Sequence, residues 1–376
     1  MTRRERLMAT LQGKPVDRPA VSFYELNGFD EHPDDPDPFN IFSHPSWQPL
    51  LELAREKTDR IVMRGVAFKA IAPDPIGHLA RDKTWLEDGA RHIRRTVAAG
   101  RRTLTMQTRQ DPDINTVWTT EHLLKSLDDL DAFLDLPVFG AGEVVDATAF
   151  LETEAALGDT GIVMIDTPDP LCLAALLFDM GEYTVTALTE PARFHRLLER
   201  FATVLLAKTE AVARLLPGRL WRIYGPEFAS PPYLPPALFR DYVCRYVRPM
   251  IDIIQRSGGF ARIHSHGRLR AILDDIAAMG PDALDPIEPP PQGDVELSYV
   301  RERHGRQLVL FGNLEVSDIE NMPAAEFAEK VKRALDEGTS GAGRGFVLMP
   351  SASPYGRELS ARTLKNYETI IRVAGV

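Results

Sequence analysis

Short apolar segments recur along this chain, and most of them end at polar, glycine or proline residues and lead into stretches with helical periodicity. The segments are rich in Val, Ile, Leu and Phe and show little strict alternation, which is typical of strands buried on both faces of a parallel sheet. Eight such segments predict eight strands, over residues 20–26, 60–66, 161–168, 219–227, 260–266, 283–288, 308–315 and 345–353.

Amphipathic stretches lie between the predicted strands, over residues 46–58, 191–215, 235–257, 268–279, 317–337 and 363–373. The 317–337 stretch opens with Ser317 and Glu320, a Ser-x-x-Glu capping box. Alternating strands and helices predict an α/β fold, a (β/α)₈ TIM barrel. The alternative is an open doubly wound sheet, which is disfavoured because no Gly-x-Gly-x-x-Gly follows any predicted strand.

Two regions depart from the strand–helix repeat. An N-terminal helix is predicted over 3–11, with Thr2 and Glu5 as its capping box and Gly13 at its end. Residues 73–120 are rich in β-formers and predict an insertion after the second strand, with a β-hairpin over 91–107. The insertion is either a lid over the barrel mouth or a surface decoration. The whole chain, residues 1–376, is predicted to be a single barrel domain.

Composition excludes several classes of protein. The hydrophobic fraction of 44% is enough for a large core and excludes a disordered chain. A net charge of −10, without a basic face, argues against nucleic acid as a partner. Cys172 and Cys244 are the only cysteines, too few for a disulfide framework or a multi-cysteine zinc module. No apolar signal region or membrane-spanning run is visible, so a cytoplasmic protein is expected.

The strongest chemical signal is the pair His264 and His266 at the end of the fifth predicted strand. Side chains two residues apart face the same way along a strand, so both imidazoles are expected to point toward one place. Catalytic Zn²⁺ commonly takes three protein ligands, and Glu227, at the end of the preceding strand, is the natural third ligand. The alternative is one packed histidine and one solvated histidine.

Two further strand ends carry candidate catalytic residues. Tyr224 precedes the proline-rich loop 230–236, which is either a rigid wall beside a site or only the entry to the next helix. Asp166 is a candidate general base or ligand-orienting group. The alternative, which we favour for Asp166, is that its carboxylate accepts backbone N–H bonds in the turn before the next helix.

Four more polar residues at strand ends are candidates for substrate contact or catalysis: Asn27, Arg64, Asn313 and Ser351. Ser351 has no evident base beside it in the sequence, so a turn serine is the better interpretation than a nucleophile. No P-loop, kinase signature or Gly-x-Ser-x-Gly nucleophile elbow occurs.

Several segments together resemble the uroporphyrinogen decarboxylase superfamily, in its methyltransferase-like branch. The similarity runs through residues 4–19, 118–130, 264–267, 311–314 and 346–350, in the family's order and spacing. The resemblance implies a (β/α)₈ barrel, in agreement with the strand count.

The decarboxylases of this superfamily bind the porphyrinogen carboxylates with an Arg-x-x-Gly-Arg segment after the first strand. Residues 24–30 contain no arginine at the corresponding place. The family also places an Asp at the end of the next strand, where residues 59–65 end in Met-Arg-Gly. Without these groups, the electrostatic basis for binding a highly anionic tetrapyrrole is lost.

The other branch contains zinc-dependent methyltransferases that act with corrinoid proteins. In this resemblance His264 matches the family's histidine, His266 occupies the first cysteine position, Ser351 falls near the second, and Glu227 matches the acid. A site with imidazoles in place of thiolates makes zinc a stronger Lewis acid, suited to polarising an oxygen or ether substrate.

The resemblance therefore implies a metal-dependent methyltransferase acting on a small O-, N- or S-methyl compound. Tyr224, Asp166 and Asn313 are the expected catalytic residues, and zinc is the expected cofactor. No Asp-x-His-x-x-Gly segment is present, so any corrinoid would be supplied by a separate partner protein. The alternatives are a carboxy-lyase that holds its substrate through Arg64, and a non-catalytic module that binds a corrinoid or porphyrin-carrying protein.

Overall fold

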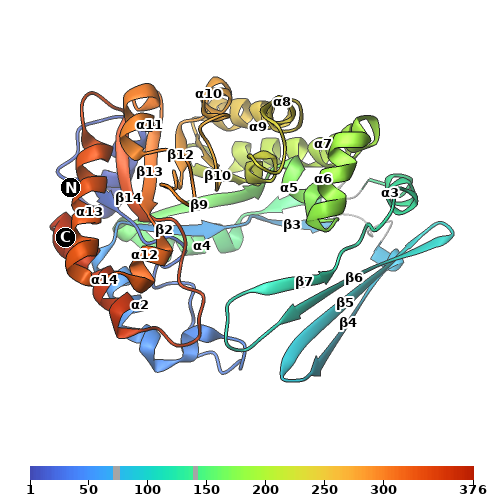
Figure 1. Cartoon of the computed structure of the whole chain (residues 1–376), viewed down its shortest axis with the longest axis horizontal. Helices are drawn as coiled ribbons and strands as arrows, with labels where there is room; N and C mark the ends of the chain where they lie inside the picture. Colours follow the sequence, from blue (N-terminus) through green and yellow to red (C-terminus); the bar gives the residue numbers. More distant parts are fainter. Residues whose placement is uncertain (71–76, 139–142) are drawn as a thin grey trace.

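A computed structural model describes residues 1–70, 77–138 and 143–376 of the chain (Figure 1). Eight parallel strands form one sheet in the order β1-β14-β13-β12-β11-β10-β9-β2. They are β1 (Ala20–Val21), β2 (Arg60–Arg64), β9 (Gly161–Pro168), β10 (Leu220–Tyr224), β11 (Phe260–His264), β12 (Ala283–Asp285), β13 (Val309–Leu314) and β14 (Gly345–Pro350). Each lies within a predicted segment, and the nearly closed α/β barrel confirms the expected TIM-barrel class.

Most of the helices cover the outside of the barrel (Figure 1). The helices are α1 (Arg3–Leu11), α2 (Gln48–Lys57), α3 (Leu127–Leu134), α4 (Thr148–Leu157), α5 (Pro170–Ala175), α6 (Met180–Thr189), α7 (Pro191–Leu215), α8 (Pro236–Phe239), α9 (Arg245–Arg256), α10 (Leu273–Ala278), α11 (Leu297–His304), α12 (Val316–Asn321), α13 (Ala324–Thr339) and α14 (Ala361–Ala374). The predicted bounds of α1 and α7 are confirmed, as is the Thr2–Glu5 capping box. No helix in the described ranges is both long and apolar enough to cross a bilayer.

The single helix predicted over 317–337 is wrong. The structure has two helices, α12 and α13, with Pro323 between them. Proline disfavours helical backbone at the residue before it, here Met322, which is extended. Ser317 lies within the first turn of α12 rather than at its N-cap, which is Glu315, and the Glu315 side chain makes no capping hydrogen bond, so the predicted capping box with Glu320 does not form. The helix predicted over 268–279 is shorter in the structure, where it is α10. The stretch predicted as one helix over 235–257 contains a π-helical turn at Arg240–Cys244.

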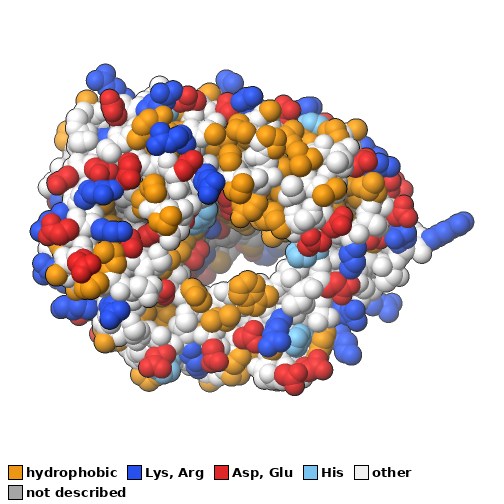
Figure 2. Space-filling view, viewed as in Figure 1, with side chains coloured by type: hydrophobic (Ala, Val, Ile, Leu, Met, Phe, Trp, Pro, Cys, Tyr) orange, Lys and Arg blue, Asp and Glu red, His pale blue; other side chains and the backbone are white. Residues whose placement is uncertain are grey.

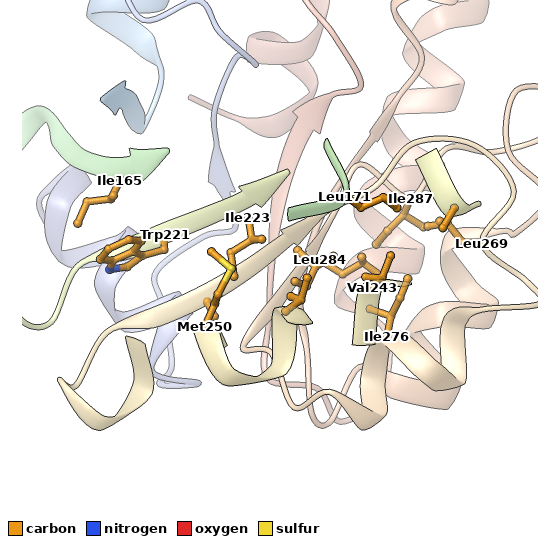
Figure 3. Close-up of a cluster of buried hydrophobic side chains, with 14 of the residues drawn as sticks. Ile165, Leu171, Trp221, Ile223, Val243, Met250, Leu269, Ile276, Leu284 and Ile287 are labelled. Carbon is orange, nitrogen blue, oxygen red and sulfur yellow. The ribbon is translucent and has the colours of Figure 1, made fainter. Parts of the chain in front are cut away.

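The alternation of side chains along the strands gives the barrel two cores. Ile162, Met164, Phe311 and Met349 belong to an inner cluster, together with Leu7 and Leu11 of α1. The neighbouring strand positions belong to the outer cluster, against the surrounding helices. Figure 3 shows Ile165, Trp221 and Ile223 of this outer layer near Met250 of α9. Inward-facing positions nearer the carboxyl ends are polar, and the candidate site lies there.

The predicted insertion is larger than a hairpin. It forms a four-stranded antiparallel sheet of β4 (Ala80–Glu87), β5 (Ala90–Ala99), β6 (Arg102–Gln110) and β7 (Val117–Glu121). The predicted hairpin is its β5–β6 pair. Residues 73–76 of the predicted insertion lie outside the described residues. A separate two-stranded pair, β3 (Ala67–Ala70) and β8 (Glu143–Asp146), links this region to the barrel.

One end of the inserted sheet is attached to loops at the carboxyl-end face of the barrel. The Arg357 guanidinium donates to the carbonyls of Pro38 and Pro112, which joins the loop after β14 to the loop after β1 and to the insertion. Arg91 of β5 donates to both carboxylate oxygens of Asp37 at 2.7 and 2.8 Å. Figure 2 shows a deep hollow between the sheet and the barrel. The position is compatible with a lid, and the closing movement stays a prediction.

Asp59 joins the first and second strands of the barrel. Its backbone N–H donates to the Val21 carbonyl at 2.6 Å, and its carboxylate accepts from the Val21 N–H at 2.8 Å. The same fully buried carboxylate pairs with Arg6 of α1 at 2.6 Å and with Arg18 at 2.8 Å. One side chain therefore holds together the seam between β1 and β2 and the helix that covers the bottom of the barrel.

We expect Asp59→Ala to lower the free energy of unfolding by about 3–5 kcal/mol, because it removes a fully buried carboxylate that pairs with Arg6 and Arg18 and accepts the Val21 N–H. Asp17→Ala is the matched control, since Asp17 also pairs with Arg6 but its side chain is 45% exposed. The control should lose about 1 kcal/mol or less. Urea unfolding followed by circular dichroism measures both, and equal losses would contradict the role of Asp59.

Candidate active site at the barrel mouth

Polar side chains meet inside the barrel where neighbouring strands end. The parallel register places Arg222 of β10 beside Asp166 of β9, and His264 of β11 beside Asp285 of β12. Arg262 lies two residues before His264 and therefore shares its inward-facing side. The carboxyl ends of barrel strands are the usual position of active sites in this fold.

Asp285 connects His264 with Arg262. Its Oδ2 atom lies 2.8 Å from His264 Nδ1, and its Oδ1 atom lies 3.0 Å from Arg262 Nε. All three side chains are buried, and Arg262 also lies over the Phe311 ring. Burial alone would raise the pKa of Asp285, but the charges of Arg262 and His264 outweigh it and hold the pKa at about 2. Asp285 is therefore an ionised carboxylate that fixes the His264 ring by its Nδ1 atom.

A second group of residues lies on the other side of His264. The Tyr24 ring is nearly parallel to the His264 ring, with centroids 5.7 Å apart, and its hydroxyl lies 3.5 Å from His264 Nε2. Arg222 donates from Nη1 to the Tyr24 hydroxyl and from Nε to Asp166 at 2.6 Å. Burial raises the pKa of Tyr24, so its hydroxyl is protonated at neutral pH. The charges of the two arginines balance those of the two aspartates.

His266 has a different environment from His264. Its Nδ1 atom lies 2.8 Å from Glu288 Oε1, while Glu288 Oε2 accepts the Gly267 N–H at 2.6 Å. The His266 side chain is 36% exposed, and no described residue bonds to its Nε2 atom. Burial lowers the pKa of His266, but its hydrogen bond to Glu288 and that carboxylate's charge outweigh burial, so the pKa is raised. In its protonated form, His266 therefore carries an Nε2 proton near the barrel mouth, while its Nδ1 atom donates to Glu288.

The predicted zinc ligands are only partly assembled. The two imidazole rings lie 4.6 Å apart between centroids and at 86° to each other. Each ring has its Nδ1 atom on a carboxylate, an arrangement that commonly supports metal-bound histidines. Glu227 instead accepts the Gly225 N–H at 3.0 Å. Across residues 1–70, 77–138 and 143–376, no three His, Cys, Asp or Glu side chains are grouped closely enough to hold a metal ion. As arranged, these residues do not complete a zinc site.

Two of the predicted substrate-binding residues do not reach the mouth. Arg64 is in register with Ile165 of the outer core, so its side chain faces away from the barrel interior. It pairs with Asp30 outside the barrel. Asn27 is buried, and its backbone carbonyl accepts from Arg60 Nε at 2.6 Å while its side chain bonds within its own loop. Both residues have structural contacts that account for their positions.

The remaining predicted residues lie around the strand ends. Asp166 belongs to the central group through Arg222, and the Arg222 guanidinium also lies 5.2 Å from the Tyr224 ring centroid. Ser351 donates to Glu315 at 2.6 Å and accepts from the Val316 N–H. Asn313 lines a separate cavity of about 180 Å³ with Glu315 and Lys330. Asp166 and Tyr224 therefore lie with the central group, whereas Ser351 and Asn313 lie beside it.

Sequence reasoning missed Tyr24, Arg222, Arg262, Asp285 and the partner role of Glu288. A usable signal was present in the alternation of strand residues. An inward-facing His264 requires an inward-facing Arg262, and an inward-facing Tyr224 requires an inward-facing Arg222. Buried arginines in otherwise apolar strands need counter-charges, and Asp166 and Asp285 lie at neighbouring strand ends to provide them.

Comparisons with known proteins agree with this architecture. The sequence profile described as "Uroporphyrinogen decarboxylase (URO-D)" matches residues 97–354, more than half of the chain. No curated protein matches the sequence. A solved structure named "methyltransferase from Methanosarcina mazei" is 16% identical, with 100% of this chain and 98% of that chain covered and a TM-score of 0.61. That likeness shows a shared fold.

A D-psicose 3-epimerase structure, determined in the presence of D-fructose, aligns less well. Its TM-score is 0.33 at 11% identity, over 61% of this chain and 92% of that chain. The extent of the profile match and the barrel fold lead to one conclusion. The chain belongs to the uroporphyrinogen decarboxylase family.

Proposed function

We propose that this protein is a methyltransferase that removes a methyl group from a small O-, N- or S-methyl compound at the barrel mouth and transfers it to a corrinoid on a separate protein. The observation that carries the proposal is the pair of carboxylate-anchored imidazoles, of which His266 keeps its Nε2 atom without a described partner. The fold shared with a protein named methyltransferase supports the same class.

In the proposed reaction, His266 donates a proton to the heteroatom that the methyl group leaves. When the bond between the methyl carbon and the heteroatom breaks, its electron pair stays on the heteroatom, which takes a proton from His266 Nε2. Glu288 stabilises the protonated imidazole before the transfer, because it accepts from Nδ1. The methyl group passes to the corrinoid nucleophile. Asp285 and Arg262 fix the His264 ring beside this position, and Tyr24 stacks against it.

The charge pattern disfavours the alternative of a lyase acting on a carboxylated substrate. Arg64, proposed above to hold such a carboxylate, pairs with Asp30 outside the barrel interior. The two interior arginines, Arg222 and Arg262, already pair with Asp166 and Asp285. A substrate carboxylate would have to displace one of these buried partners, which costs electrostatic free energy. A non-catalytic corrinoid-binding or porphyrin-binding module is the second alternative.

Turnover with free cob(I)alamin as acceptor tests the proposal, with methoxyaryl, methylamine and methyl thioether probes supplied separately. We expect methylcobalamin to form with one probe class, and His266→Ala to slow its formation by about 10²–10⁴-fold, the usual contribution of a general acid. His304→Ala is the matched control, because His304 is likewise a histidine paired with a carboxylate, that of Asp274, but it lies on α11.

Absence of methylcobalamin with every probe, or equal rates for His266→Ala and the unmodified protein, would contradict the proposal. Release of CO₂ from a carboxylated pyrrole would instead favour the lyase. Co-purification of a corrinoid protein without any turnover would favour the binding module.

Zinc ligation by His264, His266 and Glu227 is an alternative proposal, because it would occupy the His266 Nε2 atom that the proton-donor role uses. It also requires Glu227 to leave the Gly225 N–H. A zinc ion held by these residues would supply Lewis-acid activation of the substrate heteroatom. Equilibrium dialysis against zinc should then leave one equivalent on the protein and far less on His266→Ala and Glu227→Gln. No retained zinc, or equal retention by the variants, would refute zinc binding and leave the proton-donor role of His266 standing.

A further inference from the structure

Strand β4 forms an open edge of the inserted sheet. It pairs with β5 on one side, and no described strand pairs with its other side. Every residue of β4 is exposed except Trp85, which is half-buried. In Figure 1 the strand lies at the outer border of the molecule, away from the barrel helices. An open edge presents unpaired N–H and C=O groups that can bind another strand.

The side chains of β4 carry an ordered pattern of charge. Arg81, Lys83, Trp85 and Glu87 share one face of the strand because they are two residues apart. Along this face, the two cations Arg81 and Lys83 come first and the anion Glu87 comes last. The Lys83 ammonium already lies 5.8 Å from the Trp85 ring centroid. Within the described part of the chain, Arg81, Lys83 and Glu87 form no ion pair.

We propose that β4 pairs with β4 of a second copy of this chain, antiparallel and centred on Thr84, so that the two inserted sheets become one continuous sheet. This register places Arg81 opposite Glu87 of the partner subunit, and Lys83 opposite Trp85 of the partner subunit. Each contact occurs twice across the twofold axis. Opposite charges and cation–aromatic pairs directly across two strands stabilise the pairing, and a symmetric interface repeats them.

The pattern favours a second copy over an unrelated strand. Charged side chains on an edge strand usually prevent it from pairing with an unrelated strand. They are repelled by like charges on that strand, or they lose their hydration without gaining a partner. Here the charges are complementary when the strand meets itself in the opposite direction. Shifting the centre to Lys83 would place two lysines opposite each other. Shifting it to Trp85 would pair Lys83 with Glu87 of the partner subunit, but it would also place Asp82 opposite the partner's Asp88 and leave Arg81 opposite the partner's Gly89.

The turn after β4 fixes the position of this strand in the inserted sheet. Asp88 and Gly89 have φ angles of 50° and 77°, typical of a two-residue turn that fixes the register of β4 on β5. One strand pair buries less surface than the roughly 1,600 Å² of a typical stable complex. We therefore expect a concentration-dependent equilibrium between monomer and dimer rather than a permanent dimer.

Sedimentation velocity of the full chain across the micromolar range tests the proposal. The unmodified protein should shift toward the dimer as concentration rises. Arg81→Glu and Glu87→Arg should each weaken dimerisation at least tenfold, because each places like charges opposite one another. The double variant carrying both changes should restore it, because the charge pair is rebuilt with its signs exchanged. Arg256→Glu, at an exposed arginine of α9, is the control that should leave dimerisation unchanged.

A protein that stays monomeric at every concentration would overturn the proposal. So would a dimer that neither single variant weakens, because the contact would then lie elsewhere, or a double variant that dimerises no better than the single ones. Circular dichroism of each variant establishes that the barrel is folded, and these exposed positions are not expected to change it.

Discussion

The contact of Asp285 with both Arg262 and His264 organises the carboxyl-end face of this barrel. An arginine that is 1% exposed inside a barrel is strongly unfavourable without a counter-charge, and Asp285 supplies it. The same carboxylate fixes His264, whose ring then stacks on Tyr24, which in turn accepts from Arg222. The orientation of each polar group near the mouth depends on the one before it, so the site is prearranged by electrostatics and not by packing alone.

The fold could be predicted from sequence because it depends on a pattern that is local and repeated. Eight apolar segments alternating with amphipathic stretches identified every barrel strand, and capping residues located α1. The errors have local causes as well. Pro323 divides a stretch whose periodicity continues across it, and the inserted strands β4 and β7 are too exposed to show an apolar pattern.

The site was harder to predict because it depends on contacts between strands. His264 and His266 were identified by spacing, but their partners Asp285 and Glu288 lie on the next strand and its loop, about twenty residues away. Arg64 and Arg222 both lie within or at the end of predicted strands, yet only Arg222 faces the interior. One residue of register separates an inward side chain from an outward one, and the apolar runs of doubly buried strands do not reveal which is which.

A double-mutant cycle on Arg262 and Asp285 tests the central claim most directly. Arg262→Met, Asp285→Asn and the double variant are compared by the free energy of unfolding in urea. Each single change should cost about 3–5 kcal/mol, because it leaves one buried charge without its partner. The double change should cost less than their sum by about 0.5–3 kcal/mol, the coupling expected for residues in contact. Strictly additive losses would contradict a site organised by this ion pair.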